Sequence, residues 1–188
     1  MIEPDSNHLA LLLTEFFKAL PKAGIPFLIL RNYQDLPHST TNDIGLLVHP
    51  DMGPQAEVVL ADVASKCGWR IHNRARFSPI CVFLHHIESH FQLQIDFFTR
   101  VEWRGLELVP VTELFARHRK FRDIPIPHPA HEALLNLLGR LLPYGIVRDK
   151  YQQSIQNTAS AERAVFESCA ATLFGPVIGR KVLAACVN

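Results

Sequence analysis

Apolar residues recur at helical spacing in two stretches of the N-terminal half of this 188-residue chain. The first stretch follows Ser6 and ends before Pro21 and Gly24. The second begins at Ala56 and closes at Gly68. Such one-sided stripes predict two amphipathic helices that pack their apolar faces on a core. The stripe of the first helix consists of Leu9, Leu12, Leu13, Phe16, Phe17 and Leu20.

Shorter apolar or alternating runs predict strands. A turn-rich loop is expected between the first two, and the last two are joined closely enough around Glu88 and Ser89 to form a hairpin. Residues 101–109 are expected to extend the sheet as an edge piece. The predicted strands cover residues 27–30, 44–48, 69–77, 80–87 and 91–98. In the third of them, simple alternation places four basic residues on one face. These are Arg70, His72, Arg74 and Arg76.

Alternating prolines mark residues 124–129, where they remove backbone donors from any sheet ladder. We interpret this segment as an extended linker and as the domain boundary. The chain beyond it is helical in pattern, with a long second helix from about Arg148 to Leu173 that is interrupted near Asn157 to Ser160. The sequence therefore predicts an α+β fold, with a mixed sheet flanked by helices in residues 1–123 and a linker and helical domain in residues 124–188.

Composition narrows the class of protein. A hydrophobic fraction of 48% with 20% charged residues is typical of a globular protein. No apolar run reaches the roughly 20 residues of a membrane span, and the first residues lack the pattern of a secretory signal, so a cytoplasmic location is expected. A formal net charge of +1 gives no support to nucleic-acid binding. The four cysteines are widely spaced, which favours reduced thiols.

Two acids lie in short predicted strands. Asp43 opens the second strand, and Asp96 lies inside the fifth. If these strands are neighbours, the two carboxylates can bind one Mg²⁺, or Mn²⁺ in its place, because such ions prefer oxygen ligands. A two-metal site usually needs a bridging carboxylate as well. Position 45 shares a face with Asp43, but Gly45 supplies no side chain there.

Three short pieces carry a resemblance to a known family. They are Leu30-Arg31-Asn32-Tyr33-Gln34-Asp35-Leu36-Pro37, then Asn42-Asp43-Ile44-Gly45-Leu46-Leu47-Val48, then Leu93-Gln94-Ile95-Asp96. Trp103-Arg104-Gly105, and Gly145 followed by Asp149-Lys150-Tyr151, add to them. In this order the pieces resemble the nucleotidyltransferase fold, the DNA polymerase beta-like superfamily, in its small bacterial branch. The resemblance covers residues 8 to about 155.

The resemblance implies Asp43 and Asp96 as catalytic metal ligands for transfer of an NMP from a nucleoside triphosphate to a small-molecule, sugar or protein acceptor. Two features depart from the family pattern. Arg31 and Asn32 stand near the place of the Gly-rich turn that cradles phosphates, and Gly45 replaces the second acid of an Asp-x-Asp pair. Further candidate nucleotide-binding residues are Arg31, Asn32, Arg70, Arg74, Lys150 and Tyr151.

Other interpretations stay open at this point. The loss of an acid at Gly45 fits a catalytically degenerate module that binds a nucleotide or a protein partner, the latter through the apolar C-terminal residues Val177, Ile178, Val182 and Leu183. Branches of this family often accompany sugar or polysaccharide biosynthesis. A purely structural domain would bind no nucleotide. The two acids would then be a turn cap and a surface residue, the arginines a solvated strand face, and Lys150 and Tyr151 a surface pair. A zinc site at His85, His86 and His90 is a further alternative.

Overall fold

The computed structural model describes residues 4–40, 43–76, 79–147 and 149–187. The chain divides into two compact units, the first formed by Met1–Thr99 with Arg119–Ile126 and the second by Arg100–His118 with Pro127–Asn188. This division differs from the predicted boundary after residue 123. Arg100–His118 belong to the second unit, and the chain then returns to the first unit for Arg119–Ile126. Each unit is described by itself.

The first unit is built on a five-stranded mixed sheet with the order β1-β2-β5-β4-β3. Only the central pair, β2 and β5, is parallel, and the other neighbours are antiparallel. The predicted hairpin is confirmed as β4 and β5. The strands span Phe27–Ile29 (β1), Ile44–Val48 (β2), Trp69–Arg76 (β3), Ile80–His86 (β4) and Gln92–Phe98 (β5). Phe77, which we predicted to end the third strand, lies outside the described residues.

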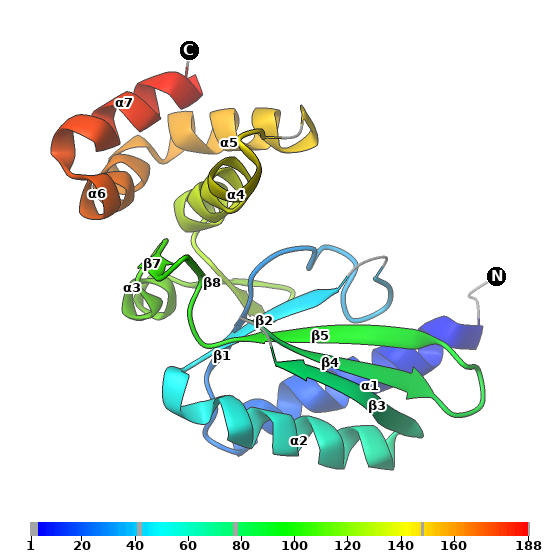
Figure 1. The fold of residues 1–188 in the computed structure, drawn as a ribbon. Coiled ribbons are helices and arrows are strands. Elements are labelled where there is room, and N and C mark those ends of the chain that lie inside the picture. Colours follow the sequence, from blue (N-terminus) through cyan, green and yellow to red (C-terminus); the bar gives the residue numbers. More distant parts are fainter. Residues whose placement is uncertain (1–3, 41–42, 77–78, 148, 188) are drawn as a thin grey trace. The chain divides into compact units, whose positions relative to one another are not determined.

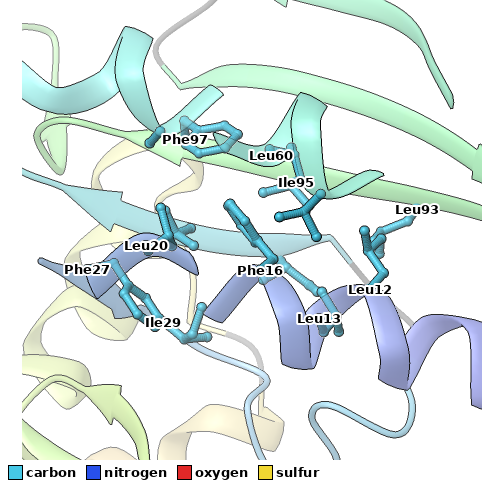
Figure 2. Packing of buried hydrophobic residues seen from close by; sticks show 14 of the residues in the cluster. Leu12, Leu13, Phe16, Leu20, Phe27, Ile29, Leu60, Leu93, Ile95 and Phe97 are labelled. Carbon is cyan, nitrogen blue, oxygen red and sulfur yellow. The ribbon is translucent and has the colours of Figure 1, made fainter. Parts of the chain in front are cut away.

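Two helices cover one face of this sheet (Figure 1). They are α1 (Pro4–Lys22) and α2 (Gly53–Lys66), the latter preceded by a short 3-10 turn at Pro50–Met52. The apolar stripe of α1 lies directly against alternate residues of the strands, as Figure 2 shows for Phe16 beside Ile95. The same alternation leaves the intervening residues of β2 and β5 on the face that the helices do not cover.

A small two-stranded sheet completes the first unit. Arg119–Phe121 (β8) pairs with Ile124–Ile126 (β9), and β9 also lies beside β1. The first three residues of the predicted linker are therefore a strand, with Ile124 and Ile126 buried in the core. Pro125 is tolerated because a strand in a two-stranded ribbon does not need a donor on both edges.

The predicted alternation of β3 is wrong beyond Ile71. A β-bulge lies between Ile71 and Asn73, so that one strand residue has no cross-strand partner of its own. Arg70 pairs with His85, whereas Arg74 pairs with Val82 of the core. The extra residue reverses the faces of everything that follows it, so the four basic residues of β3 do not share one face.

The second unit is mostly helical. Its strands β6 (Glu102–Trp103) and β7 (Leu106–Glu107) form a separate two-stranded sheet, so residues 101–109 do not extend the main sheet as predicted. Among the described residues, no helix combines the length and apolar character needed to cross a membrane. Arg148, the expected start of the long helix, lies outside the described residues, and the expected interruption falls at Glu162. The helices are α3 (Val111–Ala116), α4 (Pro129–Tyr144), α5 (Asp149–Ala161), α6 (Arg163–Phe174) and α7 (Pro176–Val187).

Neighbouring leucines of α1 test this packing. Leu12 is fully buried, while 51% of Leu11 is exposed. Leu12→Ala should lower the free energy of unfolding by about 2–5 kcal/mol, because it removes buried methyl groups and leaves a cavity. Leu11→Ala should change it by less than about 0.5 kcal/mol. Urea unfolding followed by fluorescence measures both. Equal losses in the two variants would contradict the burial of this face of α1.

Candidate functional site

The parallel pairing of β2 with β5 brings the two predicted acids together. In this register Gly45 lies beside Asp96, and Ile44 lies beside Ile95. Because Ile44 and Ile95 belong to the core under the helices, Gly45 and Asp96 lie on the opposite face of the sheet. Asp43 directly precedes β2, and its carboxyl group lies close enough to that of Asp96 to raise the pKa of Asp96. The condition that their strands are neighbours is therefore met.

Asp96 is enclosed although it lies on the face away from the helices, with 7% of its surface exposed. Gln94, two residues earlier on the same face, donates from Nε2 to Asp96 Oδ1 at 2.8 Å. Burial raises the pKa of Asp96 above its usual 3.8. Hydrogen bonds from Gln94 and Cys81 oppose this shift, and the nearby Asp43 carboxyl adds to it. The site thus holds a carboxylate whose charge is unfavourable without a further cation.

Cys81 is a site residue that sequence reasoning missed. It pairs with Asp96 across the β4–β5 hairpin, and its Sγ donates to the Pro79 carbonyl oxygen at 3.9 Å while also lying close to the Asp96 carboxyl. Burial, followed by the proximity and charge of Asp96 and the charge of Asp43, raises the pKa of the thiol to about 11. Cys81 is therefore a protonated donor at neutral pH rather than a nucleophile. The predicted hairpin contained the signal, since its register places residue 81 opposite residue 96.

Arg31 places a positive charge against the acid pair. Its Nη2 donates to Asp43 Oδ2 at 3.0 Å, and both side chains are about one-third exposed, at 37% and 30%. The next residue, Asn32, has a φ of 57°, a left-handed conformation that Asn adopts more readily than most residues. Arg31 thus contacts the predicted metal ligand directly. Asn42, which precedes Asp43 in the sequence, lies outside the described residues.

Gly45 lies where a third acid would complete a two-metal site. A Cβ at this position would lie 3.4 Å from Phe98 Cε2 and 3.8 Å from Leu30 Cβ. Both are ordinary van der Waals distances, so a side chain can be built there without moving the backbone. The neighbours on this side of Asp96 are apolar, however, and Gly45 itself is buried. The atoms within 4 Å of such a Cβ are all carbons of Phe98 and Leu30, so within the described residues no other oxygen ligand lies beside this position.

The chemistry of these donors fits one hard divalent ion. Two adjacent carboxylates supply the ligands that Mg²⁺ commonly takes from a protein, with water and phosphate oxygens filling its other positions. Within the described residues, no three or more His, Cys, Asp or Glu side chains are grouped to hold a metal ion. The pair Asp43 and Asp96 therefore fits a single Mg²⁺ or Mn²⁺ that a phosphate group helps to hold.

The predicted phosphate-binding arginines of β3 lie on different faces. Arg70 is on the face of Asp96. It pairs with His85 of β4, which lies four residues along that strand from Cys81, the partner of Asp96. Arg74 faces α2, where its Nη2 donates to Glu57 Oε1 at 2.8 Å. The bulge at residue 72 separates them, and it leaves only Arg70 on the side where a nucleotide would lie.

Lys150 and Tyr151 belong to α5 of the second unit. The side chain of Lys150 lies outside what the structure describes. The ring of Tyr151 lies 5.7 Å from the guanidinium carbon of Arg140 of α4. In α7, Val177 and Ile178 are exposed, whereas Leu183 is buried against the rest of the unit, so the predicted apolar docking face is only partly exposed.

The histidines proposed as an alternative zinc site point in different directions. His86 is buried and stacks on His8 of α1, with ring centroids 3.9 Å apart, and its Nδ1 lies 3.1 Å from Ser89 Oγ. His85, its neighbour on β4, points to the other face and lies near His72. These two rings are consequently separated by the sheet.

Comparison with known proteins supports the fold. No family model matches the chain, and no curated protein matches it. The crystal structure of JHP933 from Helicobacter pylori is similar, with a TM-score of 0.51 and 10% sequence identity. The similarity covers 91% of this chain and 73% of that chain. At this level of identity the likeness extends to the architecture alone, a mixed α+β protein with a helical C-terminal part.

The raised pKa of Asp96 gives a prediction for stability. A carboxyl with a higher pKa in the folded protein than in the unfolded chain takes up a proton on folding, so its contribution to stability falls as the pH rises above 3.8. Asp96→Asn removes this penalty while keeping an acceptor for Gln94. Without divalent ions at pH 7, the variant should therefore have a higher unfolding midpoint than the wild type, and the gain should shrink towards pH 4.

The matched control is Asp62→Asn on α2, an exposed carboxylate paired with Lys66. It should give no such pH-dependent gain, because an exposed i,i+4 pair contributes only about 0.3–0.5 kcal/mol. Thermal unfolding between pH 4 and 8 in a chelating buffer measures both variants. A lower midpoint for Asp96→Asn at pH 7 would contradict the unfavourable charge of Asp96.

Proposed function

We propose that this protein binds a nucleoside triphosphate together with Mg²⁺, and that it is a nucleotidyltransferase-like protein in which Gly45 limits the transfer reaction. The observation that carries the proposal is the proximity of Asp43 and Asp96, which the register of β2 and β5 brings together on the face of the sheet opposite the helices. A pair of adjacent carboxylates, one of them enclosed and with a raised pKa, is stabilised by a divalent cation.

The surrounding residues support a polyphosphate as the partner of that ion. Arg31 touches the acid pair, and Arg70 lies farther along the same face. Guanidinium groups bind phosphate oxygens through two parallel hydrogen bonds, which makes arginine well suited to a triphosphate. Arg74 is not part of this proposal, because it is held by Glu57 on the other face.

Transfer of an NMP would use the same site. An acceptor hydroxyl on a small molecule, a sugar or a protein would attack the α-phosphorus, forming a new phosphorus–oxygen bond while pyrophosphate leaves. A bound Mg²⁺ would supply charge neutralisation at the phosphates. The two carboxylates serve one such ion, and Gly45 offers no ligand for a second ion at the attacking hydroxyl. We therefore propose nucleotide binding as the main function and inefficient transfer.

Calorimetric titration tests the binding. ATP, GTP, CTP and UTP in excess Mg²⁺ should include at least one nucleotide that saturates the wild type, and Asp96→Ala should weaken its affinity at least tenfold, because it removes a charged ligand. Asp62→Ala and Arg74→Gln, which change charge on or beside α2, should bind as the wild type does. If none of the four nucleotides binds the wild type, the proposed function is wrong.

Restoring the missing acid tests the transfer. Gly45→Asp places a carboxylate beside Asp96, where the first side-chain atom fits at 3.4 Å from Phe98. We expect a gain in nucleotidyl transfer of at least about tenfold with acceptors that the wild type uses poorly, since a second ion can then be held. Release of pyrophosphate measures it. Gly45→Ala, which adds the Cβ without the charge, is the control and should gain nothing.

A further inference from the structure

We propose that Arg31 acts as a resident cation at Asp43, so that the acid pair accepts a divalent ion readily only when a polyphosphate is bound with it. The proposal rests on the proposed function, and it adds a property that neither the fold nor a pair of acids implies. Arg31 makes the site selective for the metal–nucleotide complex over each of its two components.

The geometry places Arg31 in competition with a metal ion. Its Nη2 lies 3.0 Å from Asp43 Oδ2, so one oxygen of this ligand is already hydrogen-bonded to a cation. The other carboxyl of the pair, Asp96, lies near Asp43 because β2 and β5 are paired with Gly45 beside Asp96. A divalent ion bound between the two acids would therefore lie close to the guanidinium group, and like charges at such short range repel strongly in a partly buried site.

The segment that carries Arg31 is anchored, so the ion pair does not depend on a freely moving loop. Tyr33 and Leu36 are buried, and the ring of Tyr33 packs against Phe121 with centroids 5.2 Å apart. Arg119 donates to the Tyr33 hydroxyl at 3.2 Å. The backbone that carries Arg31 is thus anchored by packing, which keeps the guanidinium within reach of Asp43.

A polyphosphate changes this balance. Phosphate oxygens offer the guanidinium a stronger, bidentate partner than a single carboxylate oxygen. Once Arg31 pairs with phosphate, both oxygens of Asp43 are available to the ion, and the anion lies between the two cations. Ion and polyphosphate should therefore each raise the affinity for the other, and this coupling is reciprocal by linkage.

A supporting role for Arg31 would predict something different. If the arginine only oriented Asp43 for the metal, its removal would weaken the binding of both the ion and the nucleotide. If it competes with the ion, its removal strengthens binding of the free ion and weakens binding of the nucleotide. The signs of the two changes therefore distinguish the two roles.

The experiment measures both affinities in Arg31→Gln, Arg31→Lys and the wild type. Mn²⁺ alone is titrated by electron paramagnetic resonance, and the nucleotide selected above is titrated calorimetrically with and without Mg²⁺. We expect Arg31→Gln to bind free Mn²⁺ about tenfold more tightly and the Mg²⁺–nucleotide about tenfold more weakly, because one charged hydrogen bond is lost at each partner. Arg31→Lys keeps the charge and should stay near the wild type for free Mn²⁺, but it should bind the Mg²⁺–nucleotide more weakly, because an ammonium group cannot make the bidentate bond to phosphate.

Arg74→Gln is the control, because it removes an equal charge from the helix-covered face, where Glu57 holds the guanidinium. It should change neither affinity, and thermal unfolding of each variant verifies that the fold is kept. If folded Arg31→Gln binds Mn²⁺ more weakly than the wild type, or equally well, the inference is overturned. The proposed function still holds in that case if the wild type binds the nucleotide. If Arg31→Gln does not fold, the wild type decides: free Mn²⁺ that binds as tightly as Mn²⁺ together with the nucleotide overturns the inference.

Discussion

The parallel pairing of β2 with β5 is the contact on which the rest of the first unit depends. It joins two strands that are about fifty residues apart in the sequence, and it buries Ile44 of β2 and Ile95 of β5 under α1 and α2. The same register leaves Gly45 and Asp96 side by side on the other face. Core packing and site geometry are therefore set by one interaction, and a slip of one residue would exchange the apolar and acidic faces together.

Much of this arrangement follows from the sequence. Helical spacing located α1 and α2, and the tight link at Glu88 and Ser89 identified the β4–β5 hairpin. The mixed α+β class is confirmed, and the two strands that carry Asp43 and Asp96 are neighbours, which is the condition on which the acid pair depended. These predictions succeeded because each rests on a strong local pattern or on a face that must be buried.

Other features lay beyond simple alternation. The bulge in β3 cannot be read from residue types, since Arg70 to Arg76 alternate perfectly in sequence while the strand does not. Ile124–Ile126 contains a proline, and its pairing with β8 depends on a turn that no strong motif marks. The contact of Cys81 with Asp96 required an exact hairpin register, which hydrophobic pattern gives only approximately.

The extra residue of β3 also bears on how this strand can vary in length. His72 has no cross-strand partner of its own, whereas Ile71 pairs with Leu84 and Asn73 with Phe83. Loss of His72 would close the bulge and leave Arg70 and Arg74 on their present faces. Loss of a paired residue farther along β3 would instead turn over the part of the strand beyond it. Position 72 is therefore where a one-residue deletion in this strand is expected to be neutral for the arrangement of the sheet.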